Sequence, residues 1–173
     1  MGYRVLSVFI YTVWIPVFFF SGLVLILIGF IYLPLFYKVD KLACHIIMSS
    51  LFVWPRVKGK FPTEGTYIIM MNHSSFLDVF IFPLVVSGHY TGVTAYENFK
   101  YPIFSSLLKR LKAIPIKREN LKSAIESIHK AEKVLAQGIH IGILPEGTRT
   151  ITGSINSLKK GGFHMAINTH TPI

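Results

Sequence analysis

A chain of 173 residues is long enough for one domain with a buried core. Hydrophobic residues make up 51% of it, and 18 lysines and arginines against 8 acidic residues give a net charge of +10, a combination that favours an anionic membrane surface or acidic ligands. The chain shows no nucleic-acid-binding motif, and its apolar character argues against nucleic acid as a partner. The single cysteine, Cys44, excludes an internal disulfide framework and any cysteine-based zinc site.

The N-terminal part is a long apolar run. No residue from Val5 to Tyr37 is charged, and the run exceeds the roughly 20 residues that a helix needs to cross a bilayer. Because Pro16 and Pro34 interrupt it, two arrangements are open: one spanning helix from about Pro16 to Tyr37, or two shorter helices in a hairpin within one leaflet. Basic residues cluster after the run, so the positive-inside rule places the downstream domain on the cytoplasmic side of a membrane.

The apolar segment Leu42–Trp54 predicts a helix at the membrane interface, with a core helix as the alternative. We therefore expect a membrane-anchoring helical segment over residues 1–56 and a second domain over residues 57–173. A new apolar strand is expected to begin at Pro172, so we expect the sequence to be a fragment truncated at its C-terminus.

Strand and helix patterns alternate after this segment. The alternation predicts an α/β fold: a mostly parallel, mixed sheet flanked by helices, preceded by the membrane-embedded helical segment. The predicted strands are Thr66–Met71, Tyr90–Ala95, Ala113–Lys117 and Ile139–Leu144. The predicted helices are Phe76–Val86, Ile103–Leu111, Leu121–Gln137 and Lys160–Asn168. The clearest of them has a stripe of apolar residues at helical spacing, namely Leu121, Ala124, Ile125, Ile128, Ala131 and Leu135.

A histidine and a carboxylate follow the first predicted strand. His73 and Asp78 cannot share one helix face, but they can meet if His73 lies in a loop and Asp78 in the first helical turn, with Ser75 as the N-cap. The carboxylate would then hold one imidazole N–H while the other ring nitrogen faces a substrate hydroxyl. The same residues also fit an ordinary capping box beside a loop histidine, and the stretch alone leaves both interpretations open.

Two more polar groups follow predicted strands, where α/β folds bind ligands. Arg118 ends Ile114–Arg118, and Pro145–Arg149 reads Pro-Glu-Gly-Thr-Arg. Arg118 and Arg149 each suit bidentate phosphate binding, and Gly147 would let the backbone approach a ligand closely. Each group alone also fits a surface salt bridge or a plain turn; the three groups together favour one ligand site.

The three groups resemble the motifs of the 1-acylglycerol-3-phosphate acyltransferase family. The resemblance covers Trp54 to Ile173 and is most specific in Asn-His-x4-Asp (Asn72, His73, Asp78) and Pro-Glu-Gly-Thr-Arg. The second block is matched loosely by Pro102 and well by Ile114–Arg118. The pattern after the third block is nearly matched by Lys159, Lys160, Gly161, Phe163, Met165 and Ala166.

The resemblance implies direct transfer of an acyl group from acyl-CoA or acyl carrier protein to the hydroxyl of lysophosphatidic acid. It implies His73 as general base and Asp78 as its orienting carboxylate. The residues implied in gripping the acceptor phosphate are Arg118, Glu146, Gly147, Thr148 and Arg149, supported by Asn72 and Lys160. No cofactor is implied beyond the acyl donor, and the partners implied are membrane lipids, lysophosphatidic acid and that donor.

Other functions are weighed against this one. Within the family, another glycerolipid or lysophospholipid could be the acceptor. A non-catalytic lipid-binding protein of the same fold would need no base, and a lipid esterase would need a nucleophilic serine that no Gly-x-Ser-x-Gly elbow provides. The scattered histidines do not have the spacing of a metal site, so none is expected.

Overall fold

The computed structural model describes residues 2–117 and 121–173. The chain forms two compact units: Met1–Phe61 with Val79–Val86, and Pro62–Asp78 with Ser87–Ile173. The division expected at residue 56, into an anchoring segment and a second domain, stays a prediction.

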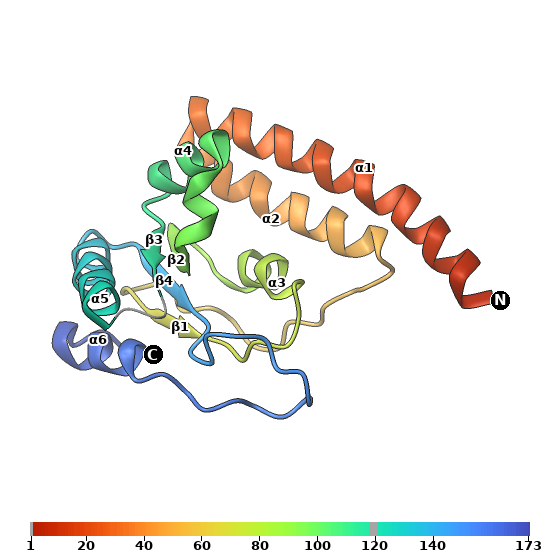
Figure 1. Ribbon diagram of the computed structural model, residues 1–173. Helices are drawn as coiled ribbons and strands as arrows, with labels where there is room; N and C mark the ends of the chain where they lie inside the picture. Colours follow the sequence, from red (N-terminus) through yellow and green to blue (C-terminus); the bar gives the residue numbers. More distant parts are fainter. Residues whose placement is uncertain (1, 118–120) are drawn as a thin grey trace. The chain divides into compact units, whose positions relative to one another are not determined.

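The first unit contains a helical hairpin (Figure 1). Helix α1 (Gly2–Ile31) and helix α2 (Leu33–Ser50) lie side by side and run in opposite directions. The break is at Tyr32, whose backbone is extended (φ −145°, ψ 98°). Pro34 follows in the first turn of α2, where a missing N–H costs nothing. Pro16 lies inside α1, because the loss of one backbone hydrogen bond does not end a long helix.

The predicted helix boundaries in this region need correction. Of the two arrangements left open, the single helix from Pro16 to Tyr37 is wrong, since the chain turns at Tyr32 between two helices. The segment Leu42–Trp54 is not a separate helix: its residues up to Ser50 are the second part of α2. The sequence pattern indicated a break near Pro34 but could not tell whether that proline ended one helix or began the next.

Among the residues that the structure describes, α1 is the one helix long and apolar enough to cross a membrane. Its segment Ser7–Ile31 has a mean hydropathy of 2.5, and only 11% of its most apolar stretch is buried. Apolar side chains left this exposed are stable in lipid rather than in water. Length and composition therefore identify α1 as the candidate membrane span.

Helix α2 packs through a single stripe of buried residues, namely Phe36, Ala43, Cys44, Ile47 and Met48. Helix α3 (Asp78–Val85) contributes Phe80 to the same unit, where its ring meets Phe18 of α1 edge-on with 6.0 Å between centroids. Cys44 is 3% exposed, as expected for a buried thiol.

The second unit is built on a parallel sheet. Its strands are β1 (Ile68–Met70), β2 (Tyr90–Ala95), β3 (Ile114–Ile116) and β4 (His140–Ile143), in the order β1-β4-β2-β3. The pairings β1–β4, β4–β2 and β2–β3 are all parallel. The predicted α/β fold with a mostly parallel sheet is thus confirmed. The predicted range of β2 is correct at both ends, and the other predicted strands extend one or two residues too far at each end.

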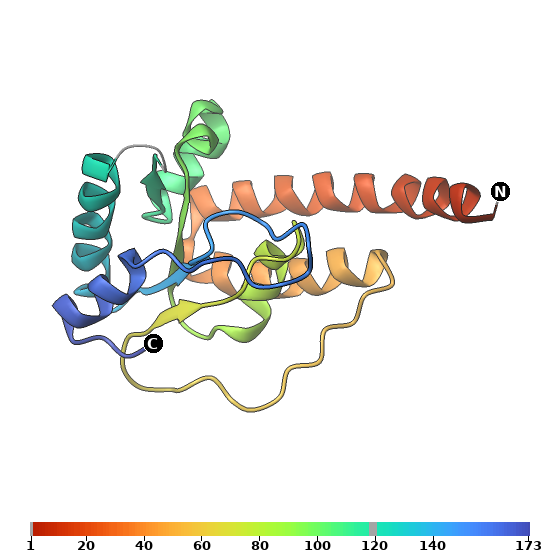
Figure 2. The same ribbon diagram turned by 60° about the horizontal axis from the view of Figure 1, so that its bottom comes forward.

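Helices α5 (Leu121–Leu135) and α6 (Gly161–Thr169) pack against this sheet on the same side (Figures 1 and 2). A short helix η1 (Tyr96–Lys100) and α4 (Pro102–Arg110) connect β2 to β3. The core of the unit consists of Ile68, Ile114, Ala131, Val134, Leu135, Ile141 and Met165.

The apolar stripe predicted for α5 is partly wrong. Ile125 is 47% exposed, whereas Val134, which the stripe left out, is buried. At about 100° per residue, Ile125 lies about 120° around the helix from the fully buried Ala131, and Val134 only about 60°. The buried face is therefore centred on Ala131 and Leu135.

One imidazole is part of the framework of the sheet. His140, at the start of β4, is buried, and its Nδ1 accepts a hydrogen bond from the backbone N–H of Tyr67 at 3.0 Å. Burial lowers the pKa of His140, and the nearby His89 lowers it further, against the opposing effect of a hydrogen bond to the backbone of Ser87. On the outer side of β1, the N–H of Ile68 donates to the carbonyl of Pro172 at 3.0 Å, at the position where a new strand was expected to begin.

A glycine lets α6 approach the sheet closely. A Cβ on the buried Gly162 would lie 2.6 Å from Cε of Met70 and 3.3 Å from Cγ2 of Ile143. The first atom is the end of a flexible side chain, but the second belongs to a β-branched residue in β4 that cannot move away easily. The absence of a side chain at Gly162 thus sets the distance between α6 and the strands.

We expect Gly162→Val to lower the free energy of unfolding by about 1–3 kcal/mol, because a branched side chain would overpack this contact. Chemical denaturation of the purified protein measures the effect. The matched control is His164→Val, which puts the same side chain at an exposed position of the same helix. Equal losses in the two variants would show that helix propensity, not close packing, is responsible.

Candidate active site

The register of the two neighbouring strands β1 and β4 creates the site. Met70 pairs with Ile143, and the N–H of Met71 donates to the carbonyl of Ile143 at 3.3 Å. His73 and Glu146 each follow at the same offset after this pair, so they leave the sheet side by side. The backbone N–H of His73 donates to Oε1 of Glu146 at 2.5 Å.

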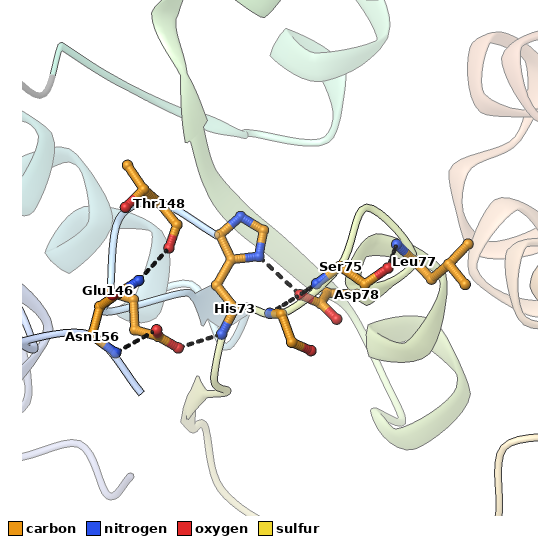
Figure 3. A network of polar contacts seen from close by, with 8 residues as sticks. His73, Ser75, Leu77, Asp78, Glu146, Thr148 and Asn156 are labelled. Carbon is orange, nitrogen blue, oxygen red and sulfur yellow. Dashed lines mark hydrogen bonds and ion pairs between the residues drawn. The ribbon is translucent and has the colours of Figure 1, made fainter. Parts of the chain in front are cut away.

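The His73 ring is held from its other side by Asp78 (Figure 3). Nδ1 of the imidazole lies 2.8 Å from Oδ2 of the carboxylate, which is buried. The same oxygen accepts the backbone N–H groups of Ser74 and Ser75, each at 3.0 Å. Three donors around one oxygen provide the compensation that a buried carboxylate requires. The predicted contact between a loop histidine and a carboxylate at the helix start is present.

The two interpretations of this stretch turn out to be compatible. The hydroxyl of Ser75 accepts the N–H of Leu77 at 3.1 Å, and Asp78 returns a contact to the N–H of Ser75, so the start of α3 is capped. The carboxylate that caps the helix is the one that contacts His73. The cap therefore fixes the position of the carboxylate relative to the ring.

This contact determines the tautomer of His73. A carboxylate can only accept, so in the neutral ring Nδ1 carries the proton and Nε2 has a lone pair. Nε2 makes no hydrogen bond to any residue that the structure describes, and the side chain is 17% exposed. An oriented imidazole with a free basic nitrogen can take a proton from a bound hydroxyl.

Glu146 connects the His73 loop to the segment that follows β4. Its Oε2 accepts the backbone N–H of Asn156 at 2.8 Å, while Oε1 accepts that of His73. These two hydrogen bonds, that of Asn156 first, lower the pKa of the Glu146 carboxyl. The side-chain amide of Asn156 donates to the carbonyl of Thr148 at 3.4 Å (Figure 3). The contact between Asn156 and Thr148 joins two ends of the segment, and Glu146 links the segment to the loop of His73.

The remaining predicted residues lie along this segment or next to it. Gly147 has φ +75°, a left-handed conformation that glycine adopts without strain. Arg149 is exposed, and its guanidinium makes no hydrogen bond or ion pair with the described residues. Thr148, Asn72 and Lys160 are exposed as well. Arg118 lies outside the described residues, so its convergence with Arg149 stays a prediction.

Two residues of this arrangement were not predicted. The N–H of Thr150 donates to the carbonyl of His73 at 2.8 Å, and Asn156 is the second donor to Glu146. No local sequence pattern marks either residue, because both contact the His73–Glu146 pair through their backbone N–H groups. The equal offset of His73 and Glu146 after their strands was a usable signal for the contact between the two loops. Within the part of the chain that the structure describes, no three metal-ligating side chains come together.

Known proteins resemble this chain over the region of the site. A family model described as "Acyltransferase" matches residues 55–173. A 1-acyl-sn-glycerol-3-phosphate acyltransferase of Limnanthes douglasii is 30% identical over 142 residues, which cover 79% of this chain and 50% of the relative. Proteins of the same name from Cocos nucifera and Borreliella burgdorferi are 35% and 33% identical over 68% and 65% of this chain. They are covered over 38% and 45% of their own lengths, so the chain spans about half or less of these relatives.

A solved structure has a similar fold. The crystal structure of the 1-acyl-sn-glycerophosphate acyltransferase PlsC from Thermotoga maritima matches with a TM-score of 0.74, over 97% of this chain and 72% of that one. The sequence identity is 19%, so the match supports the fold alone.

We expect Glu146→Gln to lower the melting temperature at neutral pH, because the amide would turn an N–H donor toward one of two backbone N–H groups. The pKa of Glu146 is lowered in the folded state, so the stabilisation is complete above the unfolded pKa and is lost as the pH falls through the folded one. The difference between wild type and variant should therefore shrink from about pH 7 toward about pH 3. The exposed Glu126→Gln is the control; a pH-independent difference at Glu146 would contradict the assignment.

Proposed function

The chain belongs to the acyltransferase family, and on that basis we propose that it acylates the free hydroxyl of lysophosphatidic acid to give phosphatidic acid. The acyl donor is a thioester of either coenzyme A or acyl carrier protein. The observation that supports this proposal most directly is the 2.8 Å contact between His73 and Asp78, which leaves Nε2 free. The names of the relatives support lysophosphatidic acid as the acceptor.

His73 acts as the general base. Its Nε2 removes the proton from the acceptor hydroxyl as that oxygen attacks the thioester carbonyl carbon. The tetrahedral intermediate collapses, the carbon–sulfur bond breaks, and the leaving thiolate takes the proton back from the imidazolium. Asp78 keeps Nδ1 protonated and stabilises the transient positive charge. No covalent acyl-enzyme is required.

The segment after β4 binds the acceptor phosphate. Arg149 supports this role because its guanidinium is exposed and has no partner among the described residues. Gly147 and Thr148 bring the backbone close to the ligand, and Arg118, which lies outside the described residues, is a second cation for the phosphate. Glu146 belongs to the same group, where its carboxylate orders the segment through Asn156. Asn72 and Lys160 are supporting residues.

The protein acts at a membrane, with α1 as the anchor. Ser7–Ile31 is apolar and mostly exposed, and an acceptor with a long acyl chain stays in the bilayer. Lys38 and Lys41, together with the later basic residues, favour the cytoplasmic side for the second unit.

The test is an acyl-transfer assay with the purified protein in vesicles. Labelled acyl-CoA and acyl carrier protein thioesters are offered with a panel that contains lysophosphatidic acid, glycerol 3-phosphate and other lysophospholipids. The proposal expects labelled phosphatidic acid from lysophosphatidic acid. Labelled product from another acceptor alone would replace the substrate assignment, and binding of lysolipid without any product would favour a non-catalytic lipid-binding protein.

We expect His73→Ala to lower kcat by about 10²–10⁴-fold, the contribution of a general base. The fold should be unaffected, because His73 is held through its backbone N–H and carbonyl, which the substitution keeps. Circular dichroism and the transfer assay measure the two effects, with the exposed His164→Ala as the control. Near-normal turnover in His73→Ala would remove this residue from the base role.

Arg149→Ala should mainly raise the KM for the acceptor. Loss of a charge-assisted contact to phosphate costs about 1.5–3 kcal/mol, which corresponds to roughly a 10–150-fold rise. The KM for the acyl donor should stay the same, because the donor is not held by this guanidinium. Lys130→Ala removes an exposed charge on α5 and serves as the control. An unchanged acceptor KM in Arg149→Ala would argue against phosphate binding there.

A further inference from the structure

The segment between β4 and α6 exposes apolar side chains to an unusual degree. Ile151 is 99% exposed, the highest value among the large hydrophobic residues that the structure describes. Ile155 and Leu158 in the same segment are 70% and 47% exposed. We refer to residues 148–158 as the apolar loop. A cluster of exposed aliphatic side chains indicates a surface that another apolar phase covers.

Polar contacts at the base of the apolar loop hold it together. The side chain of Asn156 bonds to the carbonyl of Thr148, and the N–H of Ser154 donates to the hydroxyl of Thr152 at 3.3 Å. The N–H of Thr150, next to Ile151, is bonded to the carbonyl of His73. Several polar groups of the loop are thus bonded within it or to His73, while the aliphatic side chains of Ile151 and Ile155 are left exposed.

The exposed charged residues next to the apolar loop in the sequence are all basic, since Glu146 is buried. No aspartate or glutamate occurs in residues 147–173, and Arg149, Lys159 and Lys160 flank the exposed isoleucines. All three basic residues are exposed. Aliphatic side chains bordered by cations match the interfacial region of a bilayer that contains anionic lipids, where the chains enter the acyl boundary and the cations meet headgroups.

We propose that the apolar loop inserts Ile151, Ile155 and Leu158 into the interface of an anionic membrane, beside His73. This contact is additional to any anchoring by α1, since it belongs to the other unit of the chain. It goes beyond the proposed function, because insertion requires no turnover. Where that function holds, the insertion places the base next to the lipid that carries the acceptor hydroxyl.

The test uses the full chain labelled with an environment-sensitive nitrobenzoxadiazole dye at Ile151→Cys or, separately, Ile155→Cys. Cys44 is buried, so the dye reaches the introduced thiol, and the unsubstituted protein checks for background labelling. The matched control is Lys130→Cys on α5, which lies at the opposite side of the unit from the apolar loop (Figures 1 and 2). Each protein is placed in vesicles of phosphatidylcholine and phosphatidylglycerol at about 7:3, with and without doxyl-labelled lipid.

Doxyl lipid should quench the dye at positions 151 and 155 at least about twofold more than the dye at 130, because only the former reach the acyl region. Removing phosphatidylglycerol should reduce this contrast. Equal quenching at 151 and 130 would overturn the proposal. So would blue-shifted emission at 151 without quenching, which would mean that a protein surface covers the loop. A contrast that persists unchanged in phosphatidylcholine alone would overturn the anionic requirement. None of these readings depends on acyl transfer, so an inactive protein still tests the insertion.

Discussion

The parallel pairing of β1 with β4 is the constraint on which the candidate site depends. Since Met70 and Ile143 are paired, the residues that follow them emerge together at one end of the sheet. His73 and Glu146 then meet through a backbone N–H and a carboxylate, and Thr150 closes the arrangement on the carbonyl of His73. The position of the imidazole is thus set by main-chain contacts, and its orientation by Asp78. The backbone atoms of His73 thus take part in the fold, while its ring atoms are left for chemistry.

Much of the fold was predictable because each element carries a local pattern. The alternation of strands and helices predicted the α/β sheet, and the ends of β2 were predicted correctly. The errors arose where a local rule has two outcomes. A proline can end a helix or begin one, so the pattern near Pro34 left one long helix and a hairpin that turns at Tyr32 both open. An apolar residue on the flank of a helix can face either way, so Ile125 was assigned to the core in place of Val134.

The contacts of the candidate site likewise divide into those that a local pattern predicts and those that only the fold creates. His73 and Asp78 are close in sequence, and the geometry of a helix cap was enough to predict their contact. Glu146 was expected near the ligand, but its hydrogen bonds to His73 and Asn156 join parts of the chain that only the sheet register and a closed loop bring together. These hydrogen bonds to the carboxylate come from backbone N–H groups, which no sequence motif marks. The high exposure of the Ile151 side chain likewise depends on the path of the loop, so the local amino-acid sequence did not predict it.

His140 gives the second unit a built-in intolerance of acid. Its Nδ1 must stay unprotonated to receive the N–H of Tyr67, and its lowered pKa shows that the fold favours the neutral ring. Once the surroundings fall below about pH 6.5, an unfolded chain gains a proton that the folded chain resists, and the balance moves toward unfolding. A proton on Nδ1 would face the backbone N–H of Tyr67, so two donors would meet just before β1. The contact that fixes the start of β1, the strand before His73, is therefore most stable near neutral pH.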